Sequence, residues 1–492
     1  MITSFSDLLP ITPLLLVTAT AIVAMLSVAI KRSHVLCCGI VIVGLLVTAI
    51  VTSFMLPYTA DQVTPLIVVD KFSLLFTLVI TLAALGICVL SFPYLFKLDD
   101  DKEEFYLLLA IATVGALIMV SSSHFITVVL GIETLSMSLY GMIAYPIHSK
   151  DAAKFPLEAS VKYLILSAVA SAFMLFGIAL VYLQTGSLGF TSLADFAGAN
   201  TAAGSGFVII GVLLIASGAA FKLSLAPFHM WTPDVYEGAP TPAAAYLATI
   251  GKSAMFVIVL RYFVTANVLQ IEPLVLVFSL IAVASIFAGN LLALLQDNLK
   301  RILAYSSIAH MGYILIALLA LELAPEGVGI EAISFYLIAY MVMTLGTFAM
   351  ISILSSSEKE FDYLEDYRGF FWRSPWLASF FMAMMLSLAG IPLTIGFIGK
   401  FYLFLAGVEA GLWVLLISLV IGSGIGLYYY LRVIYRMLEP VSDAAHKSSL
   451  REAGFESISS YGVLAIVLFL LLFFGVYPQP LMSLIASAVV VL

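Results

Sequence analysis

Long apolar runs separated by short polar segments occupy almost the whole chain. A helix needs about 20 predominantly apolar residues to cross the hydrocarbon core of a bilayer. Fourteen runs reach that length, and they lie at about 10–30, 35–56, 72–94, 105–122, 124–145, 158–183, 207–229, 242–265, 273–295, 301–323, 330–354, 377–408, 410–437 and 461–486. The pattern predicts an all-α polytopic membrane protein with about 14 transmembrane helices, in which residues 1–492 form a single integral membrane domain.

The composition indicates the same class. Of the 492 residues, 63% are hydrophobic and 10% are charged, whereas about a quarter of an ordinary soluble domain is charged. The three cysteines, Cys37, Cys38 and Cys88, fall inside apolar runs, so a disulfide framework is not expected. A soluble globular protein is excluded.

The basic residues divide unequally between the two sides of the predicted helices. Of the 21 lysines and arginines, fifteen fall in loops on one side, and only Lys71 and Arg261 fall on the other. Cytoplasmic loops carry the excess of basic residues in membrane proteins. We therefore expect both termini outside the cytoplasm, in the periplasm if the membrane is a bacterial inner membrane. Four lysines remain within the apolar runs: Lys162, Lys222, Lys252 and Lys400.

Two of the predicted spans contain prolines that should interrupt them. The seventh, 207–229, contains Pro227, and the twelfth and longest, 377–408, contains Pro392. Proline removes a backbone hydrogen bond and breaks or kinks a helix, and in membranes the freed backbone is tolerated where it lines a cavity. Both spans are therefore predicted to be discontinuous helices.

The two interrupted spans lie five spans apart. Because five is odd, two repeats of five helices would have opposite orientations in the membrane, an arrangement that marks ion pathways in transporters. The repeats would cover residues 105–265 and 273–437, and Glu133 in the first would correspond to the region of His310 in the second.

Charged side chains inside the spans give the strongest functional signal. A charge at the bilayer centre costs about 2.5–3.5 kcal/mol on insertion scales. Glu133, Lys222 and Lys252 should lie near mid-membrane, and Lys400 follows the break at Pro392. A lysine balanced between burial, which favours its neutral form, and a nearby carboxylate, which favours its charged form, can load and release a proton. The series predicts a proton relay. The alternatives are a protonated Glu133 within a helix interface and a Lys400 that snorkels to the membrane surface.

Three further residues are candidates for accessory roles. Lys162 follows Glu158 by four residues, so a structural ion pair on one helix face accounts for it almost as well as a relay role does. His310 and His229 could pass protons through either imidazole nitrogen, or could simply form hydrogen bonds near helix ends. His310 is the stronger candidate because it lies deeper in its span.

Other kinds of site leave no trace in the sequence. It contains no Cys/His cluster with metal-ligand spacing, no phosphate-binding glycine loop and no nucleophile–base pair. We expect no metal site, no cofactor bound by this chain and no nucleic-acid partner.

Four runs resemble the antiporter-like subunits of respiratory complex I. They are FKLSLAPFHMWTPDVYEGAPTP at 221–242, LSLAGIPLTIGFIGKF at 386–401, KRILAYSSIAHMGY at 300–313 and LGIE at 130–133. The resemblance covers essentially the whole chain. Two features differ from sister subunits of the family: no long lateral helix follows the last span, and Lys400 stands where the middle subunit has a glutamate.

The resemblance implies a function and a set of partners. Glu133 and Lys222 would form a coupled pair, Lys252 the central relay residue and Lys400 the exit-side residue of a proton-translocating membrane-arm subunit. NADH, FMN, iron–sulfur clusters and quinone would be handled by other subunits of a NADH–quinone oxidoreductase. The expected partners are the other membrane-arm subunits, including the sister antiporter-like subunits, together with the lipid bilayer and protons.

Two other functions fit the same residues. A cation/proton antiporter subunit would also need buried lysines beside broken helices. A structural scaffold would use the charges only to fix helix packing.

Overall fold

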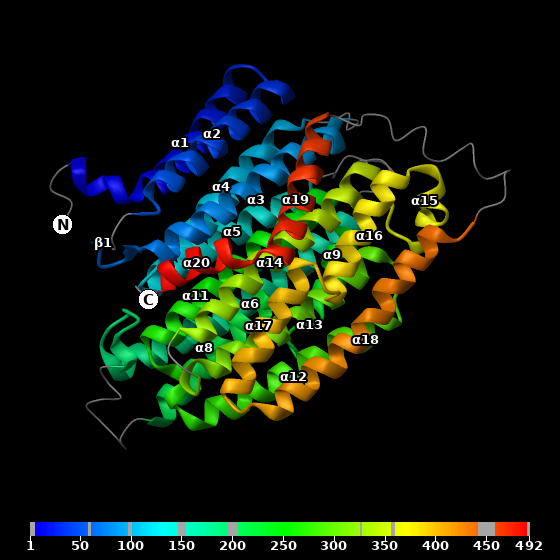
Figure 1. Cartoon of the computed structure of the whole chain (residues 1–492). Coiled ribbons are helices and arrows are strands. Elements are labelled where there is room, and N and C mark those ends of the chain that lie inside the picture. Colours follow the sequence, from blue (N-terminus) through cyan, green and yellow to red (C-terminus); the bar gives the residue numbers. More distant parts are fainter. Residues whose placement is uncertain are drawn as a thin grey trace.

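The fold is a bundle of long helices (Figure 1). A computed structural model of the chain describes residues 5–57, 61–96, 101–145, 154–194, 205–324, 327–355, 360–440 and 458–489. Its elements are α1 (Thr12–Ile30), α2 (His34–Met55), β1 (Asp61–Thr64), β2 (Ile67–Val69), α3 (Lys71–Phe96), α4 (Glu103–Val120), α5 (Phe125–Ile143), α6 (Lys154–Thr185), α8 (Ser205–Leu223), α9 (Trp231–Gly238), α10 (Thr241–Tyr246), a π-helix (Leu247–Gly251), α11 (Lys252–Thr265), α12 (Glu272–Leu294), α13 (Leu299–Leu319), α14 (Val328–Leu354), a 3₁₀ turn η5 (Leu364–Tyr367), α15 (Phe370–Arg373), α16 (Pro375–Ala389), α17 (Ile395–Glu409), α18 (Trp413–Leu438), α19 (Ile458–Val476) and α20 (Gln479–Val489).

The predicted fold class is confirmed. Among the described residues, 13 helices are long and apolar enough to cross a membrane. The predicted twelfth span consists of two shorter apolar helices in series, α16 and α17. The fourth and fifth spans, which only four residues separate, are distinct helices, α4 and α5.

The loops that carry most of the basic residues gather at one end of the bundle, which we call the basic end. Arg32, between α1 and α2, lies 2.8 Å from Glu104 at the start of α4. Tyr145, after α5, donates a hydrogen bond to the Asp101 carbonyl before α4. These contacts join the α1–α2 connection, the α3–α4 connection and the residues that follow α5. Every second connection lies at the same end when transmembrane helices alternate in direction.

The opposite end carries the antiparallel hairpin β1–β2, where β1 is labelled in Figure 1. There the Asp70 carboxylate accepts two hydrogen bonds, of 2.7 and 2.9 Å, from the Arg261 guanidinium. The assignment of Arg261 to a loop was wrong, because this residue lies within α11 and is 5% exposed. Its charge is accommodated by a bidentate ion pair with a residue that is distant in the sequence.

The last predicted span, 461–486, is not a single helix. Helix α19 ends at Val476, and α20 begins at Gln479. Pro478 and Pro480 lie at this junction, where proline cannot donate the backbone hydrogen bonds of a continuous helix. The helix therefore ends about ten residues before the predicted boundary.

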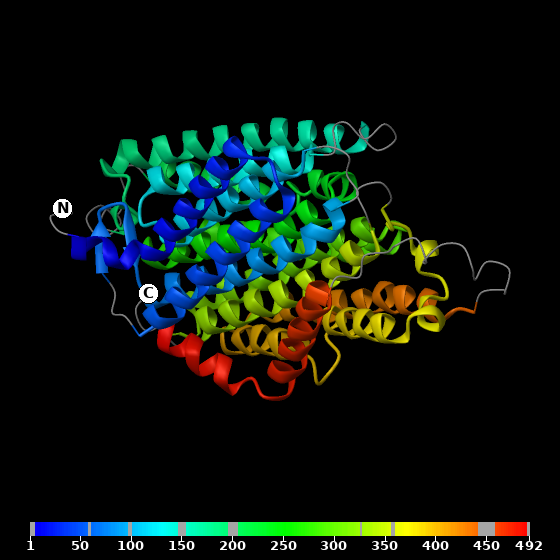
Figure 2. The same ribbon diagram turned by 90° about the horizontal axis from the view of Figure 1, so that it is seen from above.

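The centre of the bundle is formed by α13, α14 and the α10–α11 segment. The apolar stretch of α13 is completely buried, and 89% of the corresponding stretches of α14 and α10–α11 is buried. By contrast, only 28% is buried in α1 and α19, and 33% in α6. Figure 2 shows α6 along one edge of the bundle and α19–α20 along the opposite edge. Charged residues on the central helices are therefore separated from lipid by other helices.

The helices of the two predicted repeats have corresponding packing partners. In the first, α4 packs on α5 and α11, and α6 packs on α8 and α9. In the second, α12 packs on α13 and α18, and α14 packs on α16 and α17. This correspondence is what the predicted repeat requires, whereas its boundaries stay a prediction.

A glycine at the same place in each series gives a residue-level alignment. A Cβ added to Gly115 of α4 would lie 2.8 Å from the carbonyl oxygen sixteen residues later, and one added to Gly289 of α12 would lie 2.6 Å from the carbonyl sixteen residues later. The same spacing aligns Glu133 with Ser307, and Ser136 with His310. The glutamate of the first series is thus replaced by a serine in the second.

The break between α16 and α17 is closed by local hydrogen bonds. Gly390, at φ +87°, ends α16, and the N–H groups of Gly390 and Ile391 return to the carbonyl of Leu386. Such a left-handed glycine cap is common at helix ends. The Gly396 N–H then bonds to Ser387 Oγ at 3.2 Å, so the second half-helix starts against the end of the first.

We expect Gly396→Ala to destabilise this break. The added Cβ would lie 2.0 Å from the Ser387 carbonyl oxygen, which is backbone and cannot move away cheaply. Overpacking of this kind costs about 1–3 kcal/mol, and the midpoint of thermal inactivation of the purified assembly should fall. Gly424→Ala is the matched control because nothing lies within 4 Å of its added Cβ. Equal midpoints for the two variants would contradict the predicted clash.

Candidate functional site

Lys222 lies at the end of α8, immediately before the first break. Ser224, at φ +61°, turns the chain out of the helix, and the Leu225 N–H returns to the Ala220 carbonyl at 2.8 Å. The Trp231 indole, at the start of α9, donates to the carbonyl of Phe221 at 2.9 Å. The predicted discontinuity of the seventh span is therefore present, and hydrogen bonds from later residues hold its end.

The Lys222 ammonium is buried between α5 and α6. It donates hydrogen bonds of 2.6 Å to Ser136 Oγ of α5 and to Ser167 Oγ of α6, and the side chain is 8% exposed. The Tyr163 ring lies below the ammonium, 5.4 Å from its centroid. Tyr140 donates to the same Ser167 hydroxyl. Lys222 is therefore too deep to snorkel and lies within a network of hydroxyl groups.

Glu133 does not contact Lys222 directly. Its carboxylate accepts a hydrogen bond of 2.6 Å from Ser171 of α6, and it is only partly buried in this chain. Among the described residues, no carboxylate lies within 4.0 Å of the Lys222 ammonium. Ser171 lies four residues after Ser167 on α6, so Glu133 and Lys222 are bonded to serines on neighbouring turns of that helix. Glu133 therefore lies within its predicted span, but the rest of this chain covers it only partly.

Lys252 follows a π-helical segment at the centre of the bundle. Its ammonium donates a hydrogen bond of 2.6 Å to Ser307 Oγ of α13 and lies 5.6 Å from the centroid of the Tyr236 ring. Lys252 is 1% exposed. The π-helix ends at Gly251, the residue before Lys252. Single π-helical turns occur frequently at functional sites because they redirect side chains.

A small cavity, lined by both polar and apolar residues, lies beside Lys222. Its volume is about 10 Å³, enough for about one water molecule. Lys222, Ser136 and Tyr163 line one side, and Gly251 and Met255 line the other. The cavity therefore lies between Lys222 and the helix that carries Lys252.

His310 occupies the middle of α13 and uses both ring nitrogens. Nδ1 lies 2.6 Å from the Tyr336 hydroxyl of α14, and Nε2 lies 3.1 Å from the Tyr430 hydroxyl of α18. The Tyr430 hydroxyl also contacts Ser306 Oγ. A histidine bonded at both nitrogens can accept a proton on one side and release it on the other. His310 is therefore placed as the sequence suggested.

Lys400 of α17 closes the second break. Its ammonium donates to the carbonyls of Leu388 and Ala389, at 3.1 and 2.8 Å, and to Ser423 Oγ at 3.0 Å. These carbonyls belong to the last turn of α16, which lacks helical partners and carries partial negative charge. The ammonium also lies 5.6 Å from the Tyr313 ring centroid. Lys400 does not snorkel to a surface, because the residue is 9% exposed and its ammonium faces the broken helix.

Several buried polar side chains near this series have atoms without a hydrogen-bond partner among the described residues. Three lie at or just after the first break, and three others, on α9, α11 and α14, lie toward the centre of the bundle. The groups are Ser224 Oγ, both nitrogens of His229 and Thr232 Oγ1, and then Tyr236 OH, Ser253 Oγ and Tyr340 OH. Buried polar groups are nearly always satisfied by protein or by water. His229 is thus not part of the bonded series.

Lys162 belongs to an ion network at the basic end. Its ammonium lies 2.8 Å from Glu158 and 3.0 Å from Asp234 of α9, and Arg301 lies 2.9 Å from the same Asp234. Partial burial raises the pKa of Asp234, but hydrogen bonds from the two cations outweigh burial and lower it overall. The Lys162 side chain is 43% exposed, so its assignment to the buried charges was wrong. The predicted i,i+4 ion pair with Glu158 is present.

Lys300 is a buried lysine that the sequence analysis missed. The loop count placed it among the exposed basic residues, yet it is fully buried at the start of α13. Glu360 and Asp362 lie 3.1 and 3.2 Å from its ammonium. Both acids follow α14, about 60 residues later, so no local pattern links them to Lys300. Lys300 is therefore buried by contacts with other parts of the chain, although it lies just outside the predicted span 301–323.

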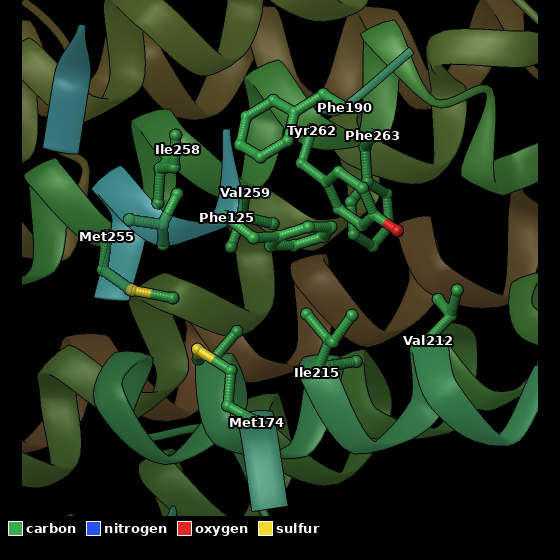
Figure 3. Close-up of a pocket in the computed structure, with 13 residues that line it drawn as sticks. Phe125, Met174, Phe190, Val212, Ile215, Met255, Ile258, Val259, Tyr262 and Phe263 are labelled. Atoms are coloured by element: carbon green, nitrogen blue, oxygen red, sulfur yellow. The ribbon is translucent and has the colours of Figure 1, made fainter. Parts of the chain in front are cut away.

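An apolar cavity of about 30 Å³ separates the first break from the opposite end (Figure 3). Figure 3 shows Phe125, Phe190 and Tyr262 above Met174 and Ile215. The rings of Phe125, Phe190 and Tyr262 pack with their centroids 5.1–5.3 Å apart. A cavity lined by apolar side chains stays dry. Met255 borders both this apolar cavity and the small cavity beside Lys222. Water therefore has a poor route from Lys222 toward the end of the bundle that carries β1–β2.

The arrangement has no features of a metal centre. Among the residues that the structure describes, no three His, Cys, Asp or Glu side chains form a group that could hold a metal ion. What it offers chemically is a set of protonatable groups, namely Lys222, Lys252, His310 and Lys400, joined to serine and tyrosine hydroxyls. We call these groups and their hydroxyl partners the buried polar series.

The fold and the buried polar series define a polytopic membrane protein that carries protonatable groups between two interrupted helices. Residues 122–426 match the family model described as NADH:quinone oxidoreductase/Mrp antiporter, transmembrane. A chain of respiratory complex I from Thermus thermophilus with bound aureothin is 31% identical, with a TM-score of 0.81; the match covers 96% of this chain and 100% of that chain. The chain belongs to the NADH:quinone oxidoreductase/Mrp antiporter family and has the fold of an antiporter-like membrane subunit.

Two further solved structures share the fold at lower identity. A chain of the membrane-bound sulfane sulfur reductase, an archaeal respiratory membrane complex, is 24% identical with a TM-score of 0.82, and the match covers 98% of this chain and 97% of that chain. A chain of the Mrp complex from a Dietzia species is 20% identical with a TM-score of 0.84, and the match covers 99% of this chain and 97% of that chain. All three structures come from multi-subunit membrane complexes.

Proposed function

We propose that this chain is a proton-translocating membrane-arm subunit of a NADH–quinone oxidoreductase, of the type of subunit N. The observation that carries the proposal is the buried polar series: three lysines and one histidine, each bonded to hydroxyls, contributed by both predicted repeats. Buried ionisable groups within a membrane bundle are costly and mark ion pathways. The match over nearly the full length to a complex I chain supports the assignment to this class of complex.

The proposed route begins at the basic end and finishes at the opposite end. Protons would reach Lys222 near the first break and pass to Lys252 by way of the small cavity beside Lys222. From Lys252 they would move through Ser307 and His310 toward Lys400. The dry cavity of Figure 3 supports this direction, since it separates Lys222 from the opposite end. Lys400, beside Ser423 of α18, would then release the proton.

Glu133 would control the proton affinity of Lys222 through its distance. Unit charges 4 Å apart interact by about 4 kcal/mol at an effective dielectric constant of 20, which corresponds to about three pKa units. Here Glu133 is bonded to Ser171 and Lys222 to Ser136 and Ser167, which represents the separated arrangement of the pair. Movement of α5 against α6 by one turn would bring the two charges together.

Tyr430→Phe tests the buried polar series at an uncharged member, the hydroxyl of a tyrosine. The change removes the hydroxyl that contacts both His310 and Ser306 while retaining the ring. We expect NADH-driven proton pumping by the reconstituted complex to fall severalfold. Tyr428→Phe, two residues earlier and exposed on the same helix, is the matched control and should pump normally. Equal pumping by the two variants would argue against a route through His310.

The electron-transfer chemistry would lie elsewhere in the complex. NADH, FMN, iron–sulfur clusters and quinone are proposed to bind other subunits, and sister antiporter-like subunits are the proposed neighbours in the membrane. The proposed location is a bacterial inner membrane with both termini in the periplasm. Co-purification with the neighbouring membrane subunits would test this assignment.

A cation/proton antiporter subunit is the second candidate. The family includes Mrp antiporters, and the fold matches a chain of an Mrp complex. Exchange of sodium for protons by the reconstituted assembly, in the absence of NADH and quinone, would favour this function. Proton pumping that depends on NADH and is independent of sodium would favour the first.

A further inference from the structure

A second buried charge cluster lies at the basic end, apart from the buried polar series. It consists of Lys300, Glu360 and Asp362, and we call it the Lys300 cluster. The Lys300 ammonium lies 3.1 Å from Glu360 Oε2 and 3.2 Å from Asp362 Oδ1, and it also donates to the Ala239 carbonyl at 3.1 Å. One buried ammonium thus faces two carboxylates. The cluster can lose its excess negative charge by binding one proton.

The two carboxylates differ in how well their ionised forms are stabilised. Glu360 accepts hydrogen bonds from the Thr241 N–H and hydroxyl, at 3.2 and 2.6 Å, and from the Tyr94 hydroxyl. Asp362 Oδ1 is near Lys300 but accepts no well-aligned hydrogen bond. Donors that bond a carboxylate favour its charged form. The proton therefore belongs on Asp362 rather than on Glu360.

The groups around Asp362 give its titration a definite direction. Burial raises its pKa, Lys300 of α13 lowers it, and Glu360 and Glu237 of α9 raise it, with a net result of about 6. Two tyrosines are the other titratable neighbours. The Tyr367 hydroxyl of η5 donates to the Phe361 carbonyl and the Tyr94 hydroxyl of α3 donates to Glu360, so neither contributes a charge. Asp362 is thus protonated below this value and ionised above it. Its side chain is 13% exposed, which leaves access to solvent.

The cluster is attached to the helix segment that leads to Lys252. Thr241, which bonds Glu360 twice, is the first residue of α10, and Ala239, which bonds Lys300, lies two residues before it. The α10, π-helix and α11 segment then runs continuously to Lys252, eleven residues later. The cluster therefore lies at the basic-end start of the segment that carries the central lysine.

We propose that the Lys300 cluster is a proton-binding site that exchanges with solvent, with Asp362 as the group that holds the proton, and that it loads protons at the basic end of α10–α11. A hydronium ion transfers its proton to the Asp362 carboxylate and leaves as water. The loading role rests on the proposed function of the chain, whereas the binding of the proton does not.

The binding is tested by infrared spectroscopy of the purified complex. As the pH falls from about 7 to about 5, one unit on either side of the Asp362 pKa, a band of protonated carboxyl should appear in the wild type. It should be absent in Asp362→Asn and return in Asp362→Glu. Glu365→Gln is the matched control, since this acid is exposed and paired with Arg368, and the band should persist. A band that persists in Asp362→Asn, or no titrating band in the wild type, would overturn the proposal.

Glu360→Gln provides a second test that does not require removal of Asp362. Without the repelling carboxylate, Lys300 acts on Asp362 alone, so the carboxyl band should titrate at lower pH by about one unit, a tenfold loss of proton affinity. An unchanged titration would contradict the shared site. The result also decides the matter if Asp362→Asn does not assemble.

The loading role has its own readout. Wild-type pumping is expected to depend on pH between about pH 5 and 7, and Asp362→Asn should lose that dependence. An unchanged pH profile, together with loss of the infrared band, would overturn the loading role. If the reconstituted wild-type complex shows no NADH-driven proton pumping while the infrared band behaves as expected, the proposed function fails and the proton-binding site stands.

Discussion

Lys222→Ala is expected to abolish proton pumping while leaving the fold intact. The ammonium is the first protonatable group of the buried polar series, and proton transfer by a positioned group is typically worth about 10²–10⁴ in rate. The fold should survive because its hydroxyl partners keep other bonds: Ser136 donates to the Ile132 carbonyl, and Ser167 accepts from Tyr140. The measurement is NADH-driven acidification in proteoliposomes that contain the assembled complex.

Two companion variants make the result specific. Lys31→Ala removes an exposed lysine at the basic end and should pump as the wild type does. Glu133→Ala removes the proposed control of Lys222 affinity, so we expect reduced pumping with normal assembly. Undiminished pumping in both Lys222→Ala and Glu133→Ala would refute the relay.

Lys400→Met is expected to impair both assembly and pumping. The ammonium donates hydrogen bonds to two carbonyls at the end of α16. Removing this donor leaves buried carbonyls unbonded, which lowers the free energy of unfolding by about 1–3 kcal/mol. The same change removes the last protonatable group of the series. Thermal inactivation of the purified complex measures the first effect, and pumping per electron transferred measures the second.

Lys400→Arg separates these two roles. A guanidinium can still donate to the carbonyls of Leu388 and Ala389, but it does not release a proton at physiological pH. We therefore expect thermal stability nearer to that of the wild type and pumping reduced at least about tenfold. Wild-type pumping in Lys400→Arg would mean that the residue acts only as a fixed helix cap.

The breaks show how far local sequence patterns can lead. Pro227 and Pro392 correctly marked two discontinuous helices, because proline affects the backbone at its own position whatever surrounds it. The partners that close the breaks were not predictable in the same way. Trp231 bonds a carbonyl ten residues earlier, and Lys400 bonds two carbonyls across the turn, which depends on how the half-helices pack.

The hydroxyl partners of the lysines also required the tertiary structure. Serine is common in membrane helices, and nothing in the sequence distinguishes Ser136 or Ser307 from serines that bond only their own helix. The alignment of Gly115 with Gly289 offered one signal, since it pairs Ser136 with His310. It becomes readable only when the backbone contacts of the two glycines are known.

The sequence by itself determined the membrane class, the alternation of the spans and the identity of the protonatable groups within them. Hydrophobic run length and the cost of burying charge act along the chain and need no partner. The tertiary structure decided which charges are truly buried. It showed that Lys162 belongs to a partly exposed ion network and that Lys300 is itself fully buried beside two carboxylates. The carboxylates of Glu360 and Asp362 reach Lys300 only after the chain folds back from α14.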